Sequence, residues 1–154
     1  MQNKKIKIIF VFLLFVFFVA GCSRPFSVEV LPGFAVSAKG RNFSIYSPDG
    51  FRMRIKTERN NPRKDTLFWA EALKTQLKND GYFLFDEILF NSINLEWRKI
   101  TWLMPVDHGY YKYMTAVAVK DRRIYVIEAS GEKELFDSYE EDIEKIIFSI
   151  FPKR

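Results

Sequence analysis

The only cysteine of the chain, Cys22, follows an apolar segment near the N-terminus, and this placement limits how the rest of the chain can be stabilised. Residues 3–7 carry three lysines and no acidic residue, and residues 8–20 are 13 uncharged residues, nearly all large and apolar. This pattern is typical of an export signal. A helix over residues 8–20 would span roughly 20 Å, less than the roughly 30 Å hydrocarbon core of a bilayer. We therefore expect residues 1–21 to be a signal rather than a transmembrane helix.

Val19-Ala20-Gly21-Cys22 places an aliphatic residue and two small residues before the cysteine, and it resembles the lipobox of bacterial lipoproteins. The resemblance implies cleavage between Gly21 and Cys22, a diacylglyceryl thioether on Cys22 and an N-acyl chain on its new amino group. Two or three acyl chains make a lasting anchor, whereas one holds only marginally. Ser23 in place of aspartate favours the periplasmic leaflet of the outer membrane if the host has two membranes. An uncleaved anchor and ordinary secretory cleavage are the alternatives.

Size and charge limit how many domains the exported part can form and which partners it can bind. Removal of residues 1–21 leaves 133 residues, which suits one domain. The net charge of +5 includes the three signal lysines, and without them 21 basic residues face 19 acidic ones, a net charge of +2. A nucleic-acid-binding domain is expected to be strongly basic, so we expect no nucleic-acid partner.

Stability of the exported part has to come from packing. Once Cys22 is modified, no thiol is left for a disulfide, a cysteine-ligated zinc ion or a nucleophile. Aromatic residues make up 17% of the chain, and they bury large apolar areas.

The pattern of apolar residues predicts an α+β domain over residues 42–154. A hairpin is expected first, because FSIYS and FRMRIKTE flank the turn residues 47–50. The other expected elements are a helix over residues 66–79 capped by Asp65, strands over 82–90, 95–104, 110–120 and 123–129, and a helix over 132–150. Short connections favour an antiparallel sheet, of about six strands with two main helices.

Residues 22–41 are expected to be a tether between the lipid and the domain. Pro25, Pro32, Gly33 and Gly40 suit a linker, and a flexible one of this length would hold the domain on the order of 25 Å from the bilayer. The apolar alternation from residue 26 to residue 36 suits an edge strand instead. The sequence leaves open whether residues 26–36 are strand or free tether.

The order of these elements resembles the PsbP-like fold of the Mog/PsbP superfamily. The stretches that carry the resemblance are FSIYSPDGFRMRI at 43–55, WAEALKTQLKNDGY at 69–82, YKYMTAVAVKDRRIYVIEAS at 111–130 and FDSYEEDIEKIIFSI at 136–150. The resemblance implies an α/β/α sandwich. It also implies a non-catalytic role, because members of that superfamily serve as assembly factors, extrinsic subunits or binding partners of larger complexes.

No residue set predicts catalysis. His108 is the only histidine and stands beside Asp107, but a zinc site needs three or four ligands. The chain has no G-x-S-x-G nucleophile elbow. We therefore expect no catalytic residue, no metal site and no cofactor other than the covalent lipid on Cys22, and the protein is not expected to be an enzyme.

Two groups of residues are candidates for contact with headgroups or a partner. The basic group is Arg52, Arg54, Lys56, Arg59, Arg63 and Lys64, and the aromatic group around one turn contains Tyr110 and Tyr111. Basic side chains on a lipid-anchored domain can meet anionic headgroups or an acidic partner. They can equally be the polar side of a half-buried hairpin.

These features predict a lipid-anchored, non-catalytic protein of the bacterial cell envelope that binds or helps to assemble other envelope components. Its protein partner and its oligomeric state stay open. The alternative is a small-ligand carrier or a hydrolase with a pocket between sheet and helix near Trp69, Trp97 and Trp102.

Overall fold

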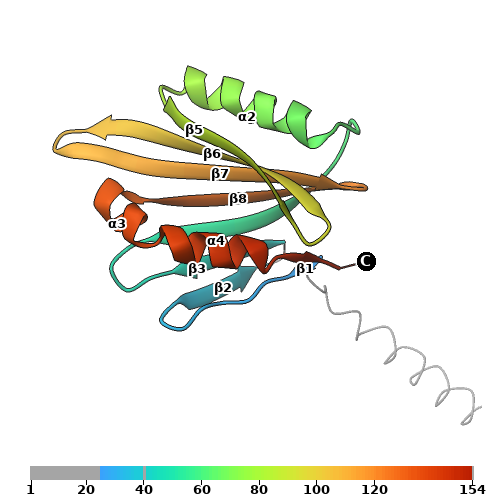
Figure 1. Cartoon of the computed structure of the whole chain (residues 1–154), viewed down its shortest axis with the longest axis horizontal. Coiled ribbons are helices and arrows are strands. Elements are labelled where there is room, and N and C mark those ends of the chain that lie inside the picture. The colour runs from blue at the N-terminus through green and yellow to red at the C-terminus, as the bar shows by residue number, and fades with distance from the viewer. Residues whose placement is uncertain (1–24, 40, 154) are drawn as a thin grey trace, which may run out of the picture.

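An antiparallel sheet of seven strands organises the described part of the chain, residues 25–39 and 41–153 of a computed structural model (Figure 1). Its strands are β2 (Ala35–Lys39), β3 (Asn42–Tyr46), β4 (Arg52–Arg59), β5 (Phe83–Ser92), β6 (Leu95–Val106), β7 (Gly109–Lys120) and β8 (Arg123–Glu132). Their order across the sheet is β2-β3-β4-β8-β7-β6-β5. The short strands β1 (Phe26–Ser27) and β9 (Phe151–Pro152) pair with each other in a second sheet.

Helices cover parts of both sheet faces. Helix α2 (Thr66–Asn79) contacts β6 and β7 on one face, and α3 (Lys133–Ser138) contacts β7 and β8 on the other, where α4 (Glu140–Phe148) continues along the sheet (Figure 1). The result is the α+β sandwich that the sequence predicts. No helix of the described residues is long and apolar enough to cross a bilayer.

Two hydrophobic cores lie on the two faces of the sheet. Trp97 belongs to the core under α3 and α4, whereas Trp102, on the same strand, belongs to the core under α2. Because successive strand residues point to opposite faces, the odd spacing of these two tryptophans places them on opposite sides. Both are fully buried.

Local sequence explains the ends of several elements. The Asp65 carboxylate accepts a hydrogen bond from the Phe68 backbone N–H at 2.8 Å, which caps α2 as the sequence predicts. Gly50 has a φ of +103°, a conformation that glycine adopts without steric cost, at the turn between β3 and β4. The two-residue turn at Asp121 and Arg122 joins β7 to β8, as expected.

The prediction of about six strands is wrong by one strand, which comes from the segment expected to be a tether. Strand β2 pairs with β3 over residues 35–39, and Phe26 of β1 is buried against Phe43 with 6.4 Å between the ring centroids. Four more apolar side chains of this segment pack on the core, namely Val28, Val30, Leu31 and Phe34. Residues 26–39 are therefore part of the packed domain.

The prediction of a single helix over residues 132–150 is also wrong. The helix breaks at Tyr139, which separates α3 from α4, so the described residues form three helices. The Tyr139 ring stacks on Phe51 with 4.9 Å between centroids, and its hydroxyl donates to the Asp49 carboxylate at 2.9 Å. Ser138 donates its hydroxyl to the Leu135 carbonyl at 2.7 Å, a bond that competes with regular helix geometry. The contacts of Tyr139 with the β3–β4 turn therefore outweigh the hydrogen bonds that a continuous helix would make.

Replacement of Phe26 by alanine tests whether the N-terminal segment is docked. The buried ring leaves a cavity when it is removed, so we expect the free energy of unfolding to fall by about 3 to 5 kcal/mol. Urea denaturation measures the change. The matched control is Ser27→Ala at the exposed neighbour, with an expected change within about 0.5 kcal/mol. Equal stability of the two variants would contradict docking of this segment.

Candidate binding surfaces

The basic side chains of β4 form part of a charged network on the sheet. Met53 and Ile55 of β4 belong to the core under α3 and α4, so Arg52, Arg54 and Lys56 point to the opposite face. Glu128 on β8 pairs with two of them: it accepts from Arg54 Nε at 2.7 Å and from Lys56 Nζ at 3.0 Å. The single carboxylate of Glu128 therefore offsets one of the three positive charges of this group.

Burial and pairing set the ionisation of this network. Burial raises the pKa of Glu128, but the hydrogen bonds from Lys56 and Arg54 outweigh burial, and the net result is a pKa below the usual range. Burial also raises the pKa of the nearby Tyr113, and the negative charge of Glu128 adds to that increase. Glu128 is therefore a carboxylate and Tyr113 a neutral phenol near neutral pH.

The remaining basic candidates lie at a different place. Arg59 ends β4, and Arg63 follows in the loop before α2; both line one open hollow together with arginines from other turns. The Lys64 ammonium lies 5.2 Å from the centre of the Phe68 ring. The predicted basic group is thus divided between a sheet face and one end of the sheet.

The two tyrosine candidates are also separated. Tyr110 is exposed, and Tyr111 is half-buried on the opposite face of β7, as alternation requires. Both are near the β6–β7 turn, at the end of the sheet away from Arg59 (Figure 1). The sequence candidates therefore do not form one continuous surface.

The pocket suggested by the three tryptophans is not formed by them. Trp69 packs beside Trp102 in the core under α2, whereas Trp97 lies beyond the sheet in the other core. No single cavity can be lined by all three. Asp107 and His108 form the exposed β6–β7 turn, and within the described ranges no group of three or more His, Cys, Asp and Glu residues is placed to hold a metal ion.

Strand β5 presents exposed apolar side chains on both of its faces, a feature that sequence reasoning missed. It is a ten-residue strand at one edge of the sheet, and within the described chain no strand pairs with its outer side. Five of its large apolar side chains are exposed, by 40% to 64%: Phe83, Leu84, Phe85, Ile88 and Leu89. We call these five residues the β5 edge. Natural edge strands usually carry charge or proline that prevents pairing, so an apolar edge of this length indicates a contact surface.

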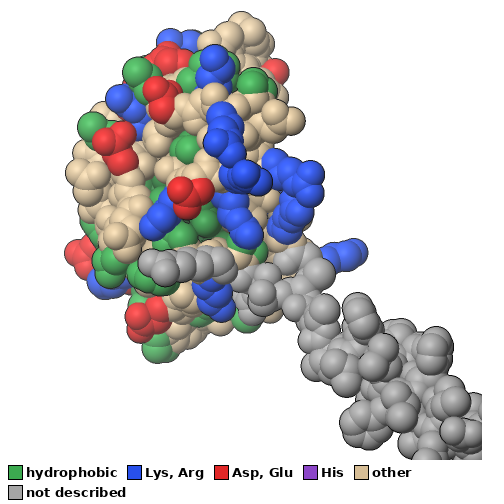
Figure 2. All heavy atoms as spheres, turned by 90° about the vertical axis from the view of Figure 1, so that its right-hand side faces the viewer, with side chains coloured by type: hydrophobic (Ala, Val, Ile, Leu, Met, Phe, Trp, Pro, Cys, Tyr) green, Lys and Arg blue, Asp and Glu red, His purple; other side chains and the backbone are tan. Residues whose placement is uncertain are grey.

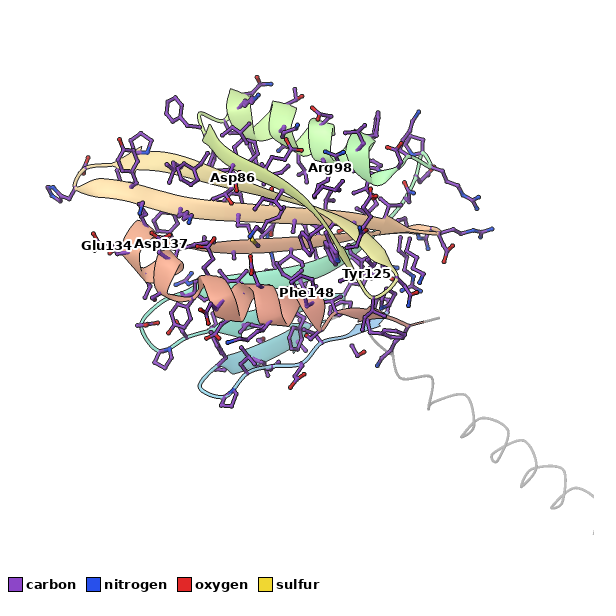
Figure 3. All side chains as sticks on the ribbon, in the orientation of Figure 1. Asp86, Arg98, Tyr125, Glu134, Asp137 and Phe148 are labelled. Carbon is purple, nitrogen blue, oxygen red and sulfur yellow. The ribbon has the colours of Figure 1, made fainter. Side chains whose placement is uncertain are left out.

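A small hollow continues the β5 edge towards α4. It has a volume of about 90 Å³, and its lining includes Ile88, Phe90 and Phe148. Phe148, labelled in Figure 3, is 47% exposed on α4, with its ring centroid 5.3 Å from that of Phe90. At the floor of the hollow, the buried Lys99 ammonium pairs with Glu144 of α4 at 2.9 Å. The hollow can accept one apolar side chain of a partner.

The residues of the predicted lipidation site, Gly21 and Cys22, lie outside the described residues. The nearest described residue is Pro25, whose carbonyl accepts a hydrogen bond from the Lys153 backbone N–H at 2.9 Å. The first described residue is therefore hydrogen-bonded to the residue that follows β9.

The fold is similar to the PsbP-like fold in comparison with solved structures. No protein-family model matches the chain, and no curated protein matches its sequence. Cyanobacterial PsbP (CyanoP) from Synechocystis matches with a TM-score of 0.61 and 5% identity, over 83% of this chain and 86% of that chain. At this identity the comparison shows a similar fold alone.

Two further solved structures have the same fold. LpqN of Mycobacterium tuberculosis, described as involved in cell envelope biogenesis, matches with a TM-score of 0.63 and 11% identity, over 82% of this chain and 83% of that chain. A protein of Bacteroides thetaiotaomicron matches with a TM-score of 0.59 and 14% identity over 87% of this chain. This chain spans only 48% of the Bacteroides protein.

Replacement of Glu128 by glutamine tests the charged network. A carboxylate with a lowered folded-state pKa adds stability above its unfolded pKa, near 4.5, and this stability is lost as the pH falls through the folded pKa. Because Arg54 is half-exposed, we expect a loss of only about 1 kcal/mol at pH 7. Denaturation at several pH values should show the difference from native protein disappearing in acid.

The control for this measurement is Glu58→Gln, which removes an exposed carboxylate from the same face of β4. We expect it to change the free energy of unfolding by less than about 0.5 kcal/mol at any pH. If the loss of unfolding free energy in Glu128→Gln stays constant as the pH falls, the packing of the side chain, and not its charge, explains the effect.

Proposed function

We propose that this protein is a lipid-anchored, non-catalytic component of the bacterial cell envelope that binds other envelope components through the β5 edge. The anchor is the acylated Cys22, after removal of residues 1–21. If the host has two membranes, the proposed location is the periplasmic leaflet of the outer membrane. The single observation that carries the binding role is the row of exposed apolar side chains along the unpaired edge strand β5.

The β5 edge supports this role in two ways. Its outer backbone groups can add a strand from a partner, which supplies main-chain hydrogen bonds. Its apolar side chains, with the hollow beside Phe148, can add the buried contacts that dominate protein interfaces. The envelope setting is supported by the lipobox in the sequence and by the shared fold with LpqN, which is described as involved in cell envelope biogenesis.

The anchor is tested by the intact mass and membrane partition of the native protein and of Cys22→Ser. We expect native protein to lack residues 1–21, to carry acyl chains and to stay with membranes, because two or three chains hold a protein durably. The serine variant cannot form the thioether and should keep its N-terminus. Native protein with an unmodified Cys22 would disprove the anchor.

The β5 edge is tested by Leu89→Lys with Val36→Lys as the matched control. Both residues are 52% exposed, and they lie on the two opposite edge strands, β5 and β2. A lysine on an edge discourages strand addition. We expect crosslinked partner recovered from membranes to fall about tenfold for Leu89→Lys, corresponding to about 1.4 kcal/mol, and to be unchanged for Val36→Lys. Equal recovery with both variants would remove the β5 edge from the proposal.

A further inference from the structure

One end of the sheet gathers five arginines from four separate stretches of the chain. Arg41 comes from the β2–β3 connection, Arg59 from the end of β4 and Arg63 from the loop before α2. Arg122 comes from the β7–β8 turn, and Arg123 is the first residue of β8. They line an open hollow of about 990 Å³, and we call them the arginine end. Figure 2 shows Lys and Arg side chains gathered on this side of the molecule, beside the point where the described chain begins.

The charges of the arginine end are not neutralised by ion pairs. In the part of the chain that the structure describes, none of these five arginines has a carboxylate oxygen within 4.0 Å, whereas Arg54 and Arg98 elsewhere on the sheet are paired. Glu58 is the one carboxylate among the described residues that line the hollow. All five arginines are exposed. Their positive charge is available to an external anion.

Hydrogen bonds hold the backbone that presents these arginines. The Asn60 N–H donates to the Arg122 carbonyl at 2.9 Å, which ties the loop before α2 to the β7–β8 turn. The Asn60 side-chain oxygen accepts from the Lys64 N–H at 3.0 Å and from Trp69 Nε1 at 2.9 Å. Because the loop is fixed at both ends, Arg59, Arg63 and Arg122 are presented together before anything binds.

The arginine end also lies beside the proposed lipid. Pro25 lines the hollow and is bonded to Lys153, so the chain is attached to the domain from residue 25 onward. Only Ser23 and Arg24 separate Pro25 from Cys22. Three extended residues reach at most about 11 Å, so an acylated Cys22 keeps Pro25 within about that distance of the headgroup layer. This reach replaces the estimate of about 25 Å for a free tether.

We propose that the arginine end docks on anionic phospholipid headgroups and fixes the orientation of the domain on the membrane. This proposal rests on the lipid anchor of the proposed function. Attraction to an anionic surface falls off within a Debye length, about 8 Å at physiological ionic strength, which is comparable to the reach of the two-residue connection. An acidic protein could match the same charge, but the anchor brings the bilayer to this end first.

In the docked orientation, the β5 edge lies along the side of the domain and does not face the membrane. Strands β5 to β8 extend from the arginine end to the opposite end of the sheet, where the β6–β7 turn with Asp107 lies (Figure 1). The β5 edge extends along the side of the domain, where a partner can reach it.

The orientation is tested with native, acylated protein reconstituted in vesicles. A fluorophore is attached to a single new cysteine, either Asn61→Cys in the lining of the hollow or Asp107→Cys at the far end. The vesicles contain phosphatidylcholine alone or mixed with phosphatidylglycerol, together with a lipid that carries a nitroxide quencher on its headgroup. Flotation with the vesicles is measured on the same samples, and it reports on the anchor independently of orientation.

In vesicles with phosphatidylglycerol, we expect quenching at position 61 to exceed quenching at position 107 by at least about fivefold, because several unpaired arginines favour contact with the anionic surface. The difference should be lost in high salt and in phosphatidylcholine alone. It should also be lost in the double variant Arg122→Glu, Arg123→Glu. The matched control, Arg52→Glu with Lys78→Glu, makes the same charge change away from this end and should leave the difference intact.

Two results overturn the inference, and they can be told apart. If the protein floats with both kinds of vesicle but quenching is equal at positions 61 and 107, or does not depend on phosphatidylglycerol, the docking is wrong while the anchor stands. If native protein floats with neither, the anchor fails and the docking fails with it. The salt measurement needs no charge substitution, so the outcome does not depend on whether the glutamate variants fold.

Discussion

Side chains of β6, β7 and β8 point alternately to two sheet faces, and each face carries its own helices, so the buried apolar residues of these strands are divided between two cores. Trp97 and Trp102 show the consequence, because a slip of one residue would move each into the wrong core. The same alternation directs Arg54 and Lys56 to the face where Glu128 pairs with them. Register on the central strands therefore determines both the packing and the charged network.

The helices are held over inner strands of the sheet, and this explains why side chains of the edge strand β5 stay exposed. Lys99 of β6 and Lys112 of β7 are buried, and their ammonium groups reach Glu144 of α4 and Asp137 of α3 at 2.9 and 2.7 Å. A buried ammonium is stable only when it is paired, so these two bonds locate α3 and α4 over the middle of the sheet. Helix α2 is placed over β6 and β7 on the other face. Neither layer extends over all of β5, and its apolar side chains stay exposed.

Local pattern was enough to predict most of the fold. Alternation located the strands from Arg52 onward, and the capping residue Asp65 located the start of α2, because both signals act within a few residues. The sequence pattern predicts a continuous helix through Tyr139, because the contacts that break it involve Phe51 and Asp49, about 90 residues earlier in the chain. Tertiary contact outweighed local preference there.

The surfaces were harder to predict than the elements. Strand β5 has as many apolar residues as a buried strand, and only its position at the end of the sheet order makes them exposed. The arginine end combines residues from four stretches of the chain, two of which, around Arg41 and Arg122, carried no signal of their own. A local sequence pattern predicts the conformation of one segment, whereas a surface is formed by segments that come together only in the folded protein.

Pairing of β1 with β9 joins the two ends of the described chain. Phe26 reaches its buried position beside Phe43 in a segment whose strand partner is Pro152, after every other described strand. A newly made chain cannot complete this pair until its last strand has been synthesised, and a contact between such distant residues carries a large loop-closure entropy. Docking of the N-terminal segment therefore costs more chain entropy than pairing of strands that are neighbours in the sequence.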